Sequence, residues 1–190
     1  TYWGNAADSA NIVLALTTAG AFGSNQAYNV LSLEFTDRGA NAQRMFGDEG
    51  LMLQPDADHT AHALLLGTNP VVTQGMALLQ RRPRIRTDLR DIQRRGGSVT
   101  VVDPRRTETA DLADTYLAIR PGTDLFLLVA MIRRILDTGA HDHDACERHS
   151  TGLDVWHQLT RRLTTAHAAD ICGIDAAEID AEADRFASAP

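Results

Sequence analysis

Three short polar segments combine turn residues with side chains that can bind a nucleotide. They are Gly67, Thr68, Asn69 and Pro70; Asp103, Pro104, Arg105, Arg106 and Thr107; and Gly122, Thr123 and Asp124. Guanidinium groups form paired hydrogen bonds with phosphate oxygens, and a carboxylate accepts hydrogen bonds from ribose hydroxyls. Glycine lets a backbone approach a ligand closely, and an asparagine amide both donates and accepts. These residue types therefore predict a nucleotide site.

Each polar segment follows an apolar run, and the third comes after the loop residues Arg120 and Pro121. The runs at residues 61–66, 98–102 and 116–119 are typical of buried parallel strands, and turn residues end each of them. Ligands of open parallel sheets bind at the carboxyl ends of the strands. We therefore expect the three segments to line one edge of a sheet, although strand-ending turns of this kind also occur for conformational reasons alone.

The elements around these strands follow a helical period. Helices are predicted over residues 10–19, 41–46, 87–95 and 124–136, with a further short strand at 28–33. After residue 139 the pattern is helical to the end, with turns at Gly152 and Gly173 and a final alanine-rich helix. This alternation predicts an α/β class, a Rossmann-like three-layer domain with a mostly parallel sheet spanning residues 1–190. Because no strand follows the last helix, we expect a fragment of a larger chain.

Composition narrows the possible functions. The chain has 190 residues, 44% of them apolar and 23% charged, with a mean hydropathy of -0.21, which suits one globular core and not a disordered chain. Its apolar runs are far shorter than the roughly 20 residues that cross a bilayer, so no membrane insertion is expected. A net charge of -7 opposes binding to nucleic acid.

The basic residues and cysteines exclude several chemistries. All 18 basic residues are arginines, so no Schiff-base or P-loop lysine is present. Cys146 and Cys172 form no CxxC pair, so this chain alone cannot build a cysteine-ligated iron–sulfur cluster. Such sparse cysteine usage suits a reducing compartment, and we expect a cytoplasmic location.

The three segments together resemble a known family. LLLGTNPVVTQGM, RDIQRRGGSVTVVDPRRTETADLAD and AIRPGTD before an apolar helix resemble the molybdopterin oxidoreductases of the dimethyl sulfoxide reductase, formate dehydrogenase and nitrate reductase family. In that family the matching loops hold the GMP half of a molybdopterin guanine dinucleotide that carries molybdenum. The resemblance therefore implies that all residues of the three segments bind this cofactor, within an α/β domain like a dinucleotide-binding sheet.

The resemblance also implies parts that this sequence does not contain. Family members have an N-terminal iron–sulfur segment, a molybdenum ligand and a C-terminal β-barrel domain. An iron–sulfur cluster in a missing N-terminal segment, the remaining domains of the enzyme and an iron–sulfur electron-transfer partner are accordingly expected. The ligand window, residues 24–46, has no cysteine. An ungapped match places the ligand near Leu33, where only Ser32 and Glu34 offer oxygens for molybdenum, and both also suit an exposed strand end.

We therefore predict a cofactor-binding portion of a molybdenum-dependent oxidoreductase with formate dehydrogenase-like or nitrate reductase-like electron transfer. The isolated chain is expected to be inactive, and no catalytic residue is assigned. One alternative is a structural subunit of the same fold without molybdenum, as in the large iron–sulfur subunit of respiratory complex I. The lack of a ligand in the window favours that alternative, and retention of the three loops opposes it. A binding module for a free nucleotide is the other alternative.

Three other features have competing interpretations. Zinc could use His141, His143, Cys146 and His149, but their spacing does not place all four on one helical face. The arginine-rich stretch over residues 81–95 suits a solvated helix face better than a phosphate site. Asp124 could read a guanine base or only cap a helix.

Overall fold

The computed structural model describes residues 14, 17–23, 36–48, 56–73 and 84–189. The chain divides into two compact units, residues 1–55 and 56–190, and the assignment of all 190 residues to one domain stays a prediction. In the first unit, α3 (Thr36–Phe46) confirms the helix expected over 41–46 and begins five residues earlier. Residues 17–21 are helical, at the end of the helix expected over 10–19. The strand expected over 28–33 lies outside the described residues.

The second unit is built on a parallel sheet. Its strands are β1 (His62–Leu66), β2 (Ser98–Val102) and β3 (Thr115–Leu117), in the order β1-β2-β3. β1 and β2 confirm the expected runs. β3 ends two residues earlier than expected because the backbone N–H of Arg120 donates to the carbonyl of Cys172, 2.8 Å away, which draws the chain out of the sheet.

The remaining elements of this unit are short helices. They are α4 (Pro70–Thr73), α5 (Ile85–Arg94), the 3-10 turn η1 (Ala110–Leu112), α6 (Asp124–Thr138), α7 (His143–His149), α8 (Leu153–Thr160), α9 (Thr165–Cys172) and α10 (Ala176–Ser188). α5 and α6 confirm the two expected helices to within two residues at each end. Gly139 and Gly173 end α6 and α9 in the left-handed region, with φ of 65° and 75°, as their sequence positions predicted.

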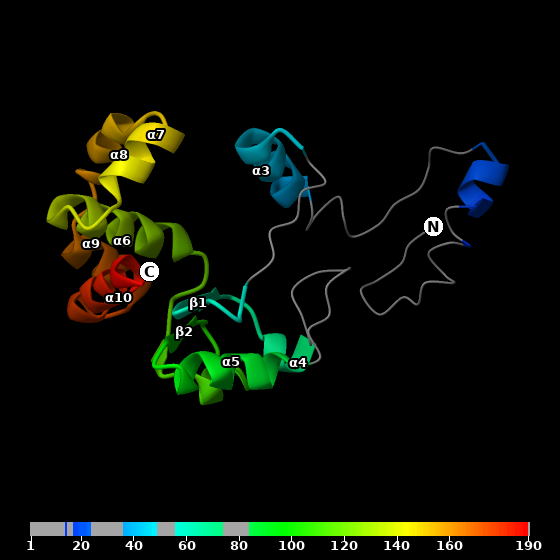
Figure 1. Cartoon of the computed structure of the whole chain (residues 1–190), viewed down its shortest axis with the longest axis horizontal. Helices are drawn as coiled ribbons and strands as arrows, with labels where there is room; N and C mark the ends of the chain where they lie inside the picture. Colours follow the sequence, from blue (N-terminus) through cyan, green and yellow to red (C-terminus); the bar gives the residue numbers. More distant parts are fainter. Residues whose placement is uncertain (1–13, 15–16, 24–35, 49–55, 74–83, 190) are drawn as a thin grey trace. The chain divides into compact units, whose positions relative to one another are not determined.

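The sheet lies between two helical layers (Figure 1). Successive side chains of a strand point to opposite faces. Val99 of β2 packs with Leu89 of α5, and Val102 packs with Leu127 of α6 and Ile179 of α10. Because both faces are covered by helices, β2 is buried on both sides and carries one buried polar residue, Thr100, which confirms the α/β class with a parallel sheet.

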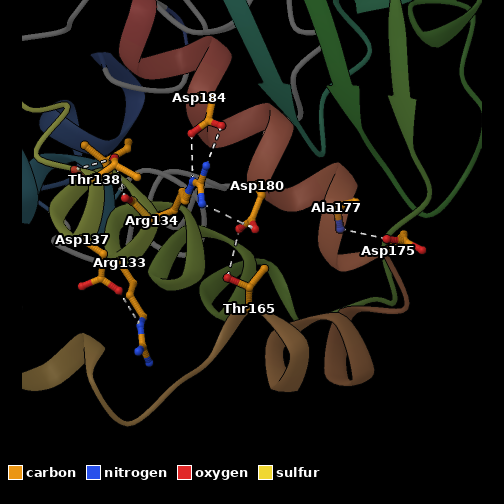
Figure 2. Close-up of polar contacts among 10 residues, drawn as sticks. Arg133, Arg134, Asp137, Thr138, Thr165, Asp175, Ala177, Asp180 and Asp184 are labelled. Carbon is orange, nitrogen blue, oxygen red and sulfur yellow. Dashed lines mark hydrogen bonds and ion pairs between the residues drawn. The ribbon is translucent and has the colours of Figure 1, made fainter.

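A polar network joins the three helices of one layer (Figure 2). The guanidinium of Arg134 on α6 donates to both carboxylate oxygens of Asp184 on α10, each at 3.0 Å, and lies 3.9 Å from Asp180. Asp180 also accepts a hydrogen bond from Thr165 on α9 at 3.1 Å. The network fixes α10 against α6 and α9, on the face of the sheet that carries Val102.

Among the described helices, none has the length and apolar content to cross a bilayer.

Candidate functional site

The parallel register brings the three predicted segments to one edge. Leu66, Val102 and Leu117, the last residues of the strands, lie side by side. The N–H of Gly67 donates to the carbonyl of Val102 at 2.9 Å, and the N–H of Asp103 donates to that of Leu117 at 3.2 Å. The first two loops therefore leave the sheet together, as the sequence predicted, and the chain that leads to the third loop begins at the neighbouring strand end, Leu117.

Asn69 links the first loop to the second. Its Oδ1 accepts from the Oγ1 and backbone N–H of Thr109, at 2.7 and 3.3 Å, and its Nδ2 donates to Oε2 of Glu108 at 2.7 Å. Pro70, the next residue, is buried at the start of α4. Both sides of the Asn69 amide are thus engaged within the protein, which positions one loop against the other.

Glu108 and Thr109 are members of this edge that the sequence interpretation missed. Thr109 is fully buried, and its hydroxyl also accepts from the backbone N–H of Val71 at 3.2 Å. The signal available in the sequence was the polar run Thr107, Glu108 and Thr109, directly after the two arginines. Asn69, the partner of Thr109, lies 40 residues away along the chain, so a local pattern does not reveal the pairing.

Asp103 shapes the second loop. Its Oδ1 accepts from the backbone N–H of Arg105 at 2.8 Å, which forms an Asx turn. Its backbone carbonyl accepts from the hydroxyl of Tyr116 at 2.9 Å. In the part of the chain that the structure describes, its Oδ2 has no hydrogen-bond partner, so this oxygen can accept from a ligand hydroxyl.

The two arginines of this loop are held differently. Arg105 lies 3.6 Å from Oε2 of Glu108, which is longer than an N–H···O hydrogen bond. Arg106 lies 2.9 Å from Oδ1 of Asp111, and its guanidinium carbon is 5.4 Å from the centre of the Tyr116 ring. Arg105 is therefore the more readily redirected of the two cations.

Thr68, Pro104 and Thr107 complete the first two segments. Thr107 is buried, and its Oγ1 accepts from the N–H of Ala110 at 3.1 Å, which starts η1. Thr68 is half-buried and Pro104 is exposed. Thr107 therefore shapes the turn from inside the fold.

Glycines leave space beside the first and third loops. Gly67 and Gly122 have φ of 56° and 77°, and a Cβ on either would meet no atom within 4 Å. Because no neighbouring atom crowds these positions, the left-handed backbone, and not a lack of space, explains why both residues are glycine. The open space admits a ligand beside the backbone.

Asp124 begins α6 and is half-buried. Its carboxylate has no hydrogen bond or ion pair with any described residue. The preceding Thr123 does not cap the helix with its side chain, since its hydroxyl donates to the carbonyl of Arg120 at 2.7 Å. A carboxylate in the first turn is stabilised by the helix dipole. Asp124 is thus an unengaged acceptor at the edge.

Arg120 attaches the third loop to α9. Its guanidinium donates to the carbonyls of Asp170 and Ile171 near the end of α9. Cations at the carboxyl end of a helix are favourably placed relative to the helix dipole. Arg120 thus anchors the loop to α9.

Cys172 lies beneath the same loop. Burial raises the pKa of its thiol, and the nearby carboxylate of Asp124 raises it further. The thiol donates to the carbonyl of Thr123 at 3.4 Å. This cysteine therefore remains a protonated thiol near neutral pH, and it is poorly suited to bind a metal.

The metal hypotheses find no support in the described side chains. Ser32 and Glu34, the suggested neighbours of molybdenum, lie outside the described residues. The rings of His141 and His143 lie with their centres 3.9 Å apart and their planes inclined by 52°. Within the described ranges, no three His, Cys, Asp or Glu side chains converge to hold a metal ion.

Known proteins share sequence with this chain, although no family model matches it. It is 32% identical over 101 residues to the alpha subunit of F420-dependent formate dehydrogenase from Methanocaldococcus jannaschii, covering 53% of this chain and 15% of that one. It is 36% identical over 109 residues to nitrate reductase from Symbiobacterium thermophilum, covering 56% and 13%. With acetylene hydratase from Syntrophotalea acetylenica the identity is 35% over 101 residues, covering 53% and 14%. The matches thus span about a seventh of each relative.

The fold also matches a solved structure. Acetylene hydratase from Pelobacter acetylenicus aligns with a TM-score of 0.73 and 24% identity, covering 88% of this chain and 22% of that one. The relatives are enzymes of the family that the three loops resemble. This chain is accordingly a homologue of part of the formate dehydrogenases, nitrate reductase and acetylene hydratase of the molybdopterin oxidoreductase family.

Proposed function

We propose that the carboxyl edge of the sheet binds the GMP half of a molybdopterin guanine dinucleotide, as part of a molybdenum-dependent oxidoreductase. The observation that carries this proposal is the convergence of three strand ends on one edge where a carboxylate, Asp124, is unengaged and a cation, Arg105, is loosely held. Homology to enzymes of this family supports it.

The groups at this edge match the chemistry of GMP. Guanine presents an N1–H and an exocyclic amine side by side, and the two oxygens of Asp124 can accept from both. The free oxygen of Asp103 suits a ribose hydroxyl, and Arg105 suits a phosphate. The space beside Gly67 and Gly122 leaves room for the ligand.

The described residues would bind and orient the cofactor without supplying an acid or a nucleophile. A bound molybdopterin would supply two-electron chemistry, with electrons leaving through an iron–sulfur partner. The names of the relatives include a dehydrogenase, a reductase and a hydratase. We therefore assign the loops to the part of the cofactor that such enzymes share, and formate dehydrogenase-like or nitrate reductase-like turnover to the complete enzyme.

Analysis of the bound ligand tests this proposal. The protein is purified with its natural flanking sequence, and the ligand released by denaturation is identified by mass spectrometry beside a molybdenum assay. We expect both a guanine dinucleotide of molybdopterin and molybdenum. A free nucleotide without molybdenum would favour the binding-module alternative, and the absence of both would favour the structural-subunit alternative.

A further inference from the structure

We propose that Glu108 is a fixed counter-charge that pairs with Arg105 when no ligand is bound and lowers the affinity of Arg105 for phosphate, so that free phosphate does not occupy this edge of the sheet. This makes Glu108 a positioning residue that acts through Arg105. The inference rests on the proposed nucleotide site and names a residue that sets its affinity.

The carboxylate of Glu108 is held in place by contacts that do not involve Arg105. Its Oε2 accepts from Nδ2 of Asn69 at 2.7 Å, and two bonds to Thr109 fix the Asn69 amide. Hydrogen bonds from its own backbone N–H and from Asn69 lower the pKa of Glu108, and Arg105 lowers it further. Glu108 is therefore ionised near neutral pH and stays in place when Arg105 moves.

Arg105 is the mobile member of the pair. Its terminal nitrogen lies 3.6 Å from Oε2 of Glu108, which is beyond hydrogen-bond distance, so this contact restrains it only weakly. Arg106, its neighbour, is fixed by a 2.9 Å contact with Asp111 and by the ring of Tyr116. When a phosphate arrives, Arg105 can turn toward it while Glu108 stays behind. The attraction between Arg105 and Glu108 is then lost, and this loss lowers the net affinity for phosphate.

The decisive variant is Glu108→Gln in the complete chain. Glutamine has nearly the same shape, and its side-chain oxygen can still accept from Asn69, so the substitution removes the charge and keeps the scaffold. Calorimetric titration with inorganic pyrophosphate and with GMP should show about three- to fivefold tighter binding of both, the scale of an exposed ion pair. Glu108→Asp, which keeps a carboxylate, should bind both within about twofold of wild type.

Two controls separate this effect from others. Glu147→Gln on α7 changes the net charge equally at an exposed position of another element and should leave both affinities unchanged. Arg105→Ala combined with Glu108→Gln should bind no tighter than Arg105→Ala alone, because the counter-charge acts through that guanidinium.

The outcomes are distinct. If wild type binds GMP and Glu108→Gln binds it equally or more weakly, the counter-charge is overturned and the nucleotide site stands. The counter-charge is also overturned if Glu108→Asp binds more weakly while Glu108→Gln binds as wild type does. The affinity would then depend on the shape of the side chain at position 108 and not on its charge. If no variant binds either probe, both the nucleotide site and the counter-charge are overturned.

Discussion

Nε2 of His62, at the start of β1, lies 2.7 Å from Oε1 of Glu182 on α10, and the two side chains are 3% and 0% exposed. Nδ1 of the same ring lies 2.7 Å from Oγ of Ser98. The other oxygen of Glu182 accepts from Thr100 at 2.9 Å and from Arg185 at 2.6 Å. This network fastens α10 to the amino end of the sheet, away from the edge that we assign to the nucleotide.

Removing the carboxylate should destabilise the protein strongly. Glu182→Ala leaves His62 and Arg185 without their shared partner, and loss of one member of a buried pair costs about 3 to 5 kcal/mol. Urea denaturation should show this loss in the free energy of unfolding. Glu178→Ala, at an exposed position of the same helix, is the matched control. A loss no larger than that of the control would contradict the structural role of the network.

The same carboxylate predicts a pH dependence. Burial raises the pKa of Glu182, but hydrogen bonds from His62, Arg185 and Thr100 outweigh burial and hold the pKa below its ordinary value of 4.5. A depressed folded pKa contributes stability that is present above the unfolded pKa and lost as pH falls through the folded one. The stability difference between wild type and Glu182→Gln should therefore be constant above about pH 5 and shrink below about pH 4. A stability difference that grows as the pH falls would show that the pKa of Glu182 is raised in the folded protein and not lowered.

Gly173, which ends α9, should tolerate alanine less well than Gly139. Both have positive φ, of 75° and 65°, so either alanine costs about 1 to 2 kcal/mol of backbone strain. A Cβ at Gly173 would also lie 3.1 Å from Nε of Arg120, whereas one at Gly139 meets no atom within 4 Å. In thermal denaturation, Gly173→Ala should have a lower melting temperature than Gly139→Ala. Equal losses would mean that Arg120 shifts without cost.

Arg105→Ala should weaken GMP binding roughly tenfold to a hundredfold, the range for a lost charge-assisted contact. Calorimetry on the complete chain measures it. Arg148→Ala, at an exposed position on α7, removes the same charge elsewhere and should leave the affinity unchanged. If the Arg105 variant binds as wild type does, the arginine only stabilises its loop.

Local patterns in the sequence predicted much of the second unit. Apolar runs located β1 and β2, and glycines marked the ends of α6 and α9, because both signals depend on neighbouring residues. Parallel strands then placed the three loops on one edge. The end of β3 was missed because Arg120 is drawn away by Cys172, a partner about 50 residues distant.

The polar partners within the fold were beyond the reach of such patterns. His62 and Glu182 are 120 residues apart in the chain, and neither has a local sequence signal for pairing. Likewise, Asn69 suggested a ligand-binding amide, but its bonds to Glu108 and Thr109 depend on how the first two loops meet. The difference between Arg105 and Arg106 also emerged only from the folded loop, although their acidic partners, Glu108 and Asp111, lie three and five residues away in the sequence.

Base selection by Asp124 tests the central claim most directly. Calorimetric titration of the complete chain with GMP and with AMP compares wild type, Asp124→Asn and the control Asp144→Asn, which lies in the first turn of α7. We predict that wild type and the control prefer GMP by at least about tenfold, because adenine lacks the paired donors that a carboxylate accepts. Asp124→Asn should lose this preference and remain folded. An Asp124→Asn variant that melts earlier but keeps the same preference would show that Asp124 only stabilises α6 and does not read the base, whereas a wild type without a preference for GMP would contradict a guanine site at this edge.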